Sequence, residues 1–170
     1  MTTKTTLLQP ALTISEFSDA LAPAFYDINA QWIEAMFVLE AHDIEVLRNP
    51  RRTIINQGGA ILYVSSERDG IIGVCALKQS DPGCYELTKM GVRETVRGLK
   101  TGEFLLQAIL ERARTMDMKL LYLLTSKKCL AAIHLYEKLG FEHSPEIMRT
   151  YGATYERSDV AMEYRGRLRA

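Results

Sequence analysis

The most constraining feature of the sequence is a succession of three strand-like segments. Apolar and β-branched residues fill the segments 60–66, 71–77 and 85–92. An aspartate–glycine pair at 69–70 separates the first two, and an Asp-Pro-Gly run at 81–83 separates the last two. Both combinations favour tight turns. Strands joined by such short turns pair in the antiparallel sense, so this region predicts a three-stranded meander.

Helices and further strands are predicted on both sides of the meander. In chain order the other elements are a strand at 12–17, a helix that begins near Ser18 or Asp19 and carries Phe25, Ile28, Trp32 and Phe37, a helix at 43–47 that stops before Pro50, a helix after residue 102, a buried strand at 120–124, a helix at 130–139 and a strand at 160–164. This order predicts an α/β (α+β) fold, in which a central mixed sheet carries helices on both faces.

Length and composition are those of one ordinary globular domain. The chain has 170 residues, of which 47% are hydrophobic and 25% are charged. These values exclude a disordered tail protein and a collagen-like fibre. We expect a single domain over residues 11–166, preceded by a flexible N-terminus at 1–10.

Charge and cysteine content limit the kinds of partner and the cellular compartment with which the sequence is compatible. Lys and Arg total 21, as do Asp and Glu, so the basic excess typical of a nucleic-acid-binding protein is absent. The three cysteines are widely spaced and form no CxxC pair, which favours a reducing compartment over a disulfide framework or a zinc site. The apolar runs are far shorter than a membrane span of about 20 residues. The first residues also lack a secretory signal, so we expect a cytoplasmic protein without a membrane partner.

A glycine-flanked loop joins the strand at 85–92 to the next helix. The loop, residues 97–102, reads Arg-Gly-Leu-Lys-Thr-Gly. Its backbone N–H groups and the start of the helix could hold a pyrophosphate. Glu103 follows where a nucleotide-binding Walker loop has lysine, and the spacing of a dinucleotide fingerprint is absent. On its own, the loop is equally compatible with an ordinary strand-to-helix turn.

A second motif lies one strand further along the chain. Ala132, Tyr136, Gly140 and Phe141 form an Ala-x-x-x-Tyr-x-x-x-Gly-Phe run. Together with the loop, this run resembles the GNAT superfamily of acyl-CoA N-acyltransferases, specifically its small single-domain members. Arg97 and Gly102 match the family's loop motif, whereas Lys100 stands where the family usually has glycine.

The resemblance extends over residues 12–164. It includes Asn-x-x-Trp in the first helix, Gly-Gly at 58–59, Glu-Leu-x-Lys-Met at 86–90 and Arg-x-Asp-Val-x-Met at 157–162. The family relation implies a mostly antiparallel, splayed sheet. It also implies acetyl-CoA as co-substrate, without a metal; the three histidines show no metal-ligand spacing either.

The resemblance assigns residues to the cofactor. The implied pyrophosphate loop consists of Arg97, Gly98, Leu99, Lys100, Thr101 and Gly102. The backbone groups of Met90, Gly91 and Val92 would pair with the pantetheine arm and polarise the thioester carbonyl. The missing side chain of Gly91 would permit the close approach of another backbone. Cys129 replaces the asparagine with which many members contact the cofactor, and Ser126 is the candidate substitute; a Cys129 acyl intermediate is a less usual route.

Two residues carry the implied chemistry. Tyr136 matches the tyrosine that protonates the leaving thiolate, although by itself it could be a boundary residue on an apolar helix stripe. Glu86 matches a general base that deprotonates the amine, or it is an ion-paired strand residue. Strand alternation puts Glu86, Thr88, Met90 and Val92 on one side, an arrangement that a bulge would alter.

The acceptor is less constrained. Trp32 is a candidate wall of its pocket, or a core residue, and Tyr151, Tyr155 and Asp159 are weaker candidates. We expect transfer to a primary amine of a small molecule or an amino acid. The alternatives are a protein N-acetyltransferase, a noncatalytic acyl-CoA sensor and a nucleotide-binding protein. The sequence leaves a homodimer open.

Overall fold

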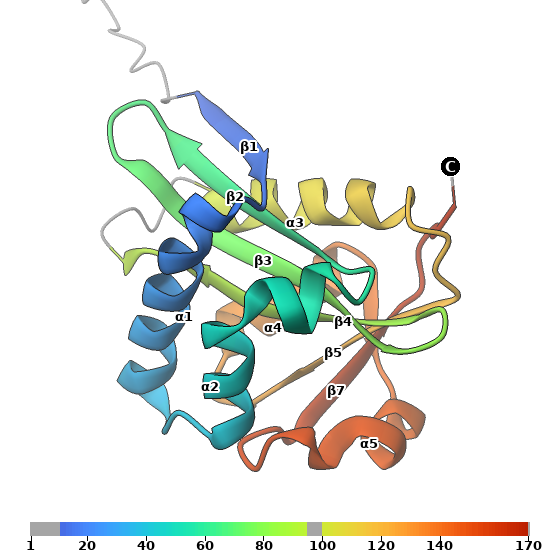
Figure 1. The fold of residues 1–170 in the computed structure, drawn as a ribbon. Helices are drawn as coiled ribbons and strands as arrows, with labels where there is room; N and C mark the ends of the chain where they lie inside the picture. The colour runs from blue at the N-terminus through green and yellow to red at the C-terminus, as the bar shows by residue number, and fades with distance from the viewer. Residues whose placement is uncertain (1–10, 95–99, 170) are drawn as a thin grey trace, which may run out of the picture.

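The strands form one sheet, in which a single neighbouring pair is parallel and the others are antiparallel. The computed structural model describes residues 11–94 and 100–169, and its seven strands follow the order β1-β2-β3-β4-β5-β7-β6. All neighbours pair antiparallel except β4 and β5, which are parallel. The strands are β1 Leu12–Glu16, β2 Ala60–Ser66, β3 Gly70–Asp81, β4 Cys84–Val92, β5 Leu120–Thr125, β6 Phe141–His143 and β7 Val160–Tyr164. The predicted mixed, mostly antiparallel sheet is thus confirmed (Figure 1).

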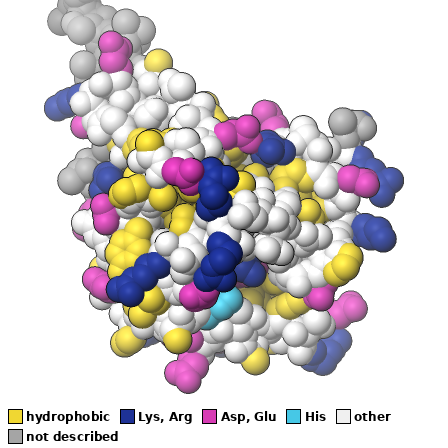
Figure 2. Space-filling view, viewed as in Figure 1, with side chains coloured by type: hydrophobic (Ala, Val, Ile, Leu, Met, Phe, Trp, Pro, Cys, Tyr) yellow, Lys and Arg dark blue, Asp and Glu magenta, His cyan; other side chains and the backbone are white. Residues whose placement is uncertain are grey.

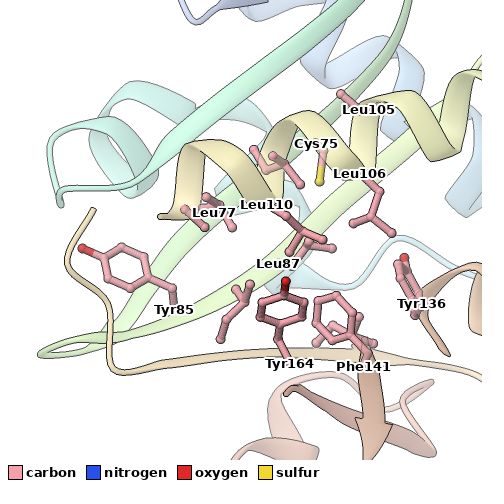
Figure 3. Packing of buried hydrophobic residues seen from close by; sticks show 14 of the residues in the cluster. Cys75, Leu77, Tyr85, Leu87, Leu105, Leu106, Leu110, Tyr136, Phe141 and Tyr164 are labelled. Atoms are coloured by element: carbon pink, nitrogen blue, oxygen red, sulfur yellow. The ribbon is translucent and has the colours of Figure 1, made fainter. Parts of the chain in front are cut away.

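Helices cover both faces, as predicted. They are α1 Ala22–Met36, α2 Ala41–Arg48, α3 Thr101–Ala113, α4 Leu130–Lys138 and α5 Pro145–Tyr151, with short helical turns at Asp19–Leu21, Arg51–Ile55 and Gly152–Thr154. Side chains of α1 and α2 pack on one face, where α5 also lies against β5 and β7. Side chains of α3 and α4 pack on the other face, beside Phe141 (Figures 1 and 3). The expected flexible N-terminus, 1–10, lies outside the described residues.

Three details differ from the sequence prediction. The first long helix ends at Met36, and Phe37 follows it in an extended conformation. Strand β6 has only three residues, too few to give an alternating pattern. Helix α5 was not predicted, although its N-terminus carries a sequence signal. The Ser144 hydroxyl accepts the Ile147 N–H, and Pro145 occupies the first helical position.

The parallel pair β4–β5 separates after three residues. Cys84, Tyr85 and Glu86 pair with 120–122, and the pairing stops there. The remainder of β4, residues 87–92, therefore diverges from β5. This split in the middle of the sheet positions the candidate site.

A bulge in β4 lies beside the split. Val74 of β3 pairs with Gly91 and Ala76 pairs with Thr88, so two residues of β4 lie opposite one of β3. One of the two is Lys89, whose φ of 52° is in the left-handed region. The bulge changes which face each later side chain occupies.

The expected placement of four β4 side chains on one face is consequently wrong for two of them. Glu86 and Thr88 lie on the α1–α2 face, because the intervening Leu87 belongs to the core under α3. Met90 and Val92 pack on that same α3–α4 core, because the bulge shifts the alternation by one residue. The two faces of β4 thus present different chemistry to the split.

Candidate active site

Two adjoining pockets occupy the split. The smaller has a volume of about 90 Å³ and lies between the diverging ends of β4 and β5. The larger, about 690 Å³, extends from the end of β4 to the start of α3 and α4. Both are lined by Trp32, Met90, Cys129, Ala132 and Tyr136. A molecule that fills the larger pocket therefore reaches the smaller one.

The larger pocket contains the described part of the predicted pyrophosphate loop. Lys100, Thr101, Gly102 and Glu103 all line it at the N-terminus of α3. Lys100 has φ +55°, a left-handed conformation that glycine adopts most readily. Arg97, Gly98 and Leu99 lie outside the described residues.

Thr101 indicates that the larger pocket suits a polar ligand. Its side chain is buried, yet its Oγ1 has no hydrogen-bond partner among residues 11–94 and 100–169. A buried hydroxyl without a partner costs free energy that a ligand can restore. The first N–H groups of α3 also lack partners within the helix and favour an anion. These features fit the pyrophosphate and pantetheine arm of acetyl-CoA.

Met90, Gly91 and Val92 form one wall of the larger pocket. They lie beyond the last β4–β5 pair, so the edge of β4 that faces β5 makes no strand pairing there. The space beside Gly91 differs from the expectation, however. A Cβ at this position would be 2.6 Å from Cδ1 of Trp32, so the missing side chain admits an indole ring rather than another backbone.

The position of Trp32 is fixed from within α1. Its Nε1–H donates to Oδ1 of Asn29 over 3.0 Å, and the Asn29 amide donates to the Phe25 carbonyl over 2.9 Å. The Asn-x-x-Trp spacing thus holds the indole ring against Gly91. Trp32 lines both pockets, as well as contributing to the α1–α2 core.

Tyr136 stands where the two pockets meet. It is 8% exposed, and its hydroxyl lies 4.0 Å from Sδ of Met90. The Tyr136 ring packs edge-on against Phe141, which in turn contacts Tyr164 (Figure 3). Burial raises the pKa of Tyr136 far above its usual value, so the phenol is protonated at neutral pH.

Ser126 belongs to the smaller pocket and not to the lining of the larger one. Its Oγ accepts the Lys128 N–H over 3.3 Å, which orders the turn before α4. Cys129 follows at the N-cap of α4 and lines both pockets.

A network of charged side chains closes the other end of the smaller pocket. We call Glu40, Asp43, Lys89, Tyr155 and Arg157 the charged network. Lys89 Nζ donates to Asp43 Oδ1 over 2.7 Å and to the Tyr155 hydroxyl over 3.1 Å. Arg157 donates through Nη1 and Nη2 to both oxygens of Asp43, and through Nη1 to Glu40. Outside this network, charges of both signs are interspersed on the α1–α2 face (Figure 2).

The charges within the network shift one another's pKa values. Burial by itself raises the pKa of Asp43, but the Arg157 hydrogen bond and the Lys89 charge outweigh it and lower the pKa to about 2. Burial lowers the pKa of Lys89, against the opposing effect of Asp43. Sequence reasoning missed Lys89, Asp43 and Arg157 as site residues, because a bulge and contacts between distant segments assemble them.

Glu86 is next to the network but is deeper than expected. It is 4% exposed and does not line the smaller pocket, although Leu87 and Thr88 do. Burial raises the pKa of Glu86, and the charges of Lys89 and Lys78 oppose the rise. A carboxylate with a raised pKa is suited to accept a proton near neutral pH, here through Thr88 or a water molecule.

The three weaker candidates separate in the structure. Tyr155 lines the smaller pocket. Tyr151 instead stacks on Tyr122 and donates to Asp81. Asp159 accepts the Lys127 N–H and lines a separate groove beside α4.

Comparison with known proteins identifies the family. Residues 16–141 match the model of the acetyltransferase (GNAT) family. The chain belongs to this family. Its fold agrees, since a GNAT acetyltransferase from Staphylococcus aureus superposes with a TM-score of 0.80 at 20% identity, covering 91% of this chain and 98% of that one.

Curated relatives match part of the GNAT domain. The uncharacterized N-acetyltransferase YjgM of Escherichia coli is 39% identical over 93 residues, which are 53% of this chain and 56% of that protein. The uncharacterized N-acetyltransferase C1271.07c of Schizosaccharomyces pombe is 31% identical over 56% of this chain and 60% of its own. The chain thus spans little more than half the length of these relatives. An amino-acid acetyltransferase of Mannheimia succiniciproducens is 27% identical over 77% of this chain but 30% of its own length.

Two further properties concern the described residues alone. None of their helices is both long and apolar enough to cross a membrane. No group of three or more His, Cys, Asp or Glu side chains in 11–94 and 100–169 is arranged to hold a metal ion.

Proposed function

We propose that the protein transfers an acetyl group from acetyl-CoA to a primary amine of a small molecule or amino acid, by direct attack in a ternary complex. The observation that carries this proposal is the split between β4 and β5, which joins the larger pocket to the smaller one at Tyr136. The N-acetyltransferase relatives support the reaction class, and the amino-acid acetyltransferase relative supports an amino acid acceptor.

The cofactor enters through the larger pocket in this mechanism. The start of α3 and Thr101 hold the pyrophosphate and neighbouring polar groups. The free edge of β4 at Met90, Gly91 and Val92 pairs with the pantetheine arm and directs the thioester toward Tyr136. A backbone N–H near the thioester stabilises the oxyanion that forms during attack.

Three proton transfers accompany the reaction. Glu86, acting through Thr88 or water, takes a proton from the acceptor ammonium, whose pKa is near 10 in water. The free amine attacks the thioester carbonyl and the C–N bond forms, the nitrogen releases its second proton to water, and the C–S bond breaks as the amide forms. Tyr136 donates its proton to the leaving sulfur, and its high pKa keeps that proton available until the thiolate develops.

Thiol release from acetyl-CoA, measured against a panel of amines, tests the proposal together with calorimetric binding of acetyl-CoA. Binding with amine-dependent release supports the enzyme. Release only with peptide N-termini would support a protein N-acetyltransferase instead. Binding without release across the panel would favour a noncatalytic acyl-CoA sensor, and competition by ATP would favour a nucleotide site.

A further inference from the structure

The charged side chains that line the smaller pocket are both cationic. Lys89 and Arg157 line it, whereas the carboxylates Glu40, Asp43 and Glu86 do not. A third cation, Lys128, has its Nζ 5.5 Å from the ring centroid of Phe37, another lining residue. Since the Lys89 side chain is only 2% exposed, a ligand in this pocket meets the Arg157 guanidinium rather than a carboxylate.

Arg157 keeps hydrogen-bonding capacity for such a ligand. Its bonds within the described chain use Nη1 twice and Nη2 once, with Asp43 and Glu40 as acceptors. A guanidinium has five N–H donors, so the Nε–H and the second Nη2–H remain, and these two project from the same edge of the planar group. This pair is the arrangement that binds a carboxylate through two parallel hydrogen bonds.

Asp43 holds this guanidinium in place. The Asp43 side chain is fully buried, and that of Arg157 is 13% exposed. The Arg157 group also lies 4.6 Å from the ring centroid of Tyr155 and 5.8 Å from that of Phe37. Since both aromatic rings line the pocket, the guanidinium is ordered before any ligand arrives, which reduces the entropy cost of binding.

The same charges disfavour other acceptors. A polyamine would bring a second ammonium group, and neither Lys89 nor Arg157, the charged side chains that line the pocket, can accept its hydrogen bonds. A peptide N-terminus has an uncharged amide in place of the carboxylate. A zwitterion matches both features, because its carboxylate can face Arg157 while its ammonium reaches Glu86 through Thr88 or a water molecule.

We infer that the acceptor is a free amino acid, or a close analogue with an acidic group beside its amine, and that Arg157 binds this acidic group. The inference rests on the proposed function and assigns the substrate class of its acceptor pocket. It makes Arg157 a specificity-determining residue, with Lys89 contributing charge and Asp43 acting as a positioning residue.

Matched acceptors test the inference on the unmodified protein. Thiol release is measured for each free L-amino acid, for its α-carboxamide, for the amine that lacks the carboxylate, and for dipeptides. We expect the best free amino acid to exceed its carboxamide in kcat/KM on the order of 10- to 100-fold, as two charge-assisted hydrogen bonds predict. Equal or better rates with the carboxamide, the plain amine or the dipeptide would overturn the inference.

Substitution of Arg157 tests its role. Arg157→Gln should reduce the preference for the free acid to within about 3-fold, on the same scale, and change the carboxamide rate much less. Arg157→Lys keeps the charge but not the paired donors, so it should retain part of the preference and covers the case in which the Gln variant fails to fold. Arg165→Gln, at a partly exposed ion pair with Glu163 on β7, is the matched control and should leave the preference unchanged.

Binding separates this inference from the proposed function. Trp32 is the single tryptophan and lines both pockets, so its fluorescence reports ligands in either one. Quenching by free amino acids that Arg157→Gln abolishes, without thiol release, would support the acidic-group site and contradict the transferase. Acetylation of amines regardless of a carboxylate would support the transferase and overturn the inference. Binding of no free amino acid, with CoA present, would overturn it as well.

Discussion

The two sides of the split handle protons and charge in opposite ways. On the α1–α2 side, the charged network buries two carboxylates and two cations that neutralise one another. On the α3–α4 side, Tyr136 lies among Met90, Phe141 and other apolar groups, and its hydroxyl stays protonated. One side therefore suits a charged acceptor, and the other suits a neutral acid beside a sulfur atom. Substitutions on each side should have separable consequences.

The largest effect is expected on the Tyr136 side. Tyr136→Phe removes the proton donor but little packing, because the one hydrogen-bonding contact of the hydroxyl among the described residues is the weak one with the Met90 sulfur, at 4.0 Å. We expect kcat to fall by roughly 10²- to 10⁴-fold, with acetyl-CoA affinity nearly unchanged. Thiol release and calorimetry measure the two quantities. Loss of acetyl-CoA binding instead would assign Tyr136 a structural role.

Substitutions in the charged network should mainly lower the free energy of unfolding. Asp43→Asn leaves Lys89 and Arg157 without their shared counterion, which should destabilise the fold by about 3–5 kcal/mol. In the unmodified protein, the lowered pKa of Asp43 means that its contribution is complete above the ordinary carboxyl pKa of 3.8 and is lost as pH falls toward about 2. This loss amounts to about 2 kcal/mol. Denaturant unfolding of both proteins between pH 2 and 6 checks it; the same acid-dependent loss in Asp43→Asn would contradict the assignment.

Glu86 links the charged side to catalysis. Because its pKa is raised, kcat/KM should rise with pH through a value above the usual carboxyl range. Glu86→Gln should lower kcat/KM by on the order of 10²-fold and remove that limb of the profile. A pH–rate series on both proteins provides the comparison, and an unchanged rate and profile in the variant would exclude Glu86 as the base.

A substitution at Gly91 tests whether both pockets depend on the position of the Trp32 indole ring. Gly91→Ala places a methyl group 2.6 Å from the Trp32 ring, so the indole must move. We expect a destabilisation of about 1–3 kcal/mol and weaker acetyl-CoA binding, since Trp32 lines both pockets. Gly152→Ala is the matched control, because its methyl group would displace the flexible end of Met148, away from both pockets. Equal effects of the two variants would refute the role given to the indole.

The smallest effect concerns the backbone at the start of α3. Lys100→Gly relieves a left-handed conformation with φ +55°, although glycine also has more freedom to lose on folding. The expected net change is a stabilisation below about 1 kcal/mol, visible as a small rise in Tm. A clear fall in Tm would indicate that Lys100 makes stabilising contacts that outweigh its strain.

The apolar side of the site could be predicted from sequence, and the charged side could not. The spacing of Ala132, Tyr136 and Phe141 is local to one helix and its end, so the motif also determines where the tyrosine lies. Lys89 instead reaches Asp43 because of a bulge, which no alternating pattern reveals. Arg157 meets Asp43 across 114 residues of chain, and a single sequence contains no signal for such a contact.

The short pairing of β4 with β5 has a mechanical consequence. The sheet consists of two panels, β1–β4 and β5-β7-β6, fastened at one end by three residue pairs. At the open end, ion pairs connect the two panels. Arg157, which precedes β7 in the second panel, pairs with Glu40 and Asp43, which belong to the chain segment of the first panel. A molecule bound in the split would contact both panels and hold them together. Force applied to separate them would meet resistance that depends on acid at one end, where Asp43 is protonated, and on ligand in the middle.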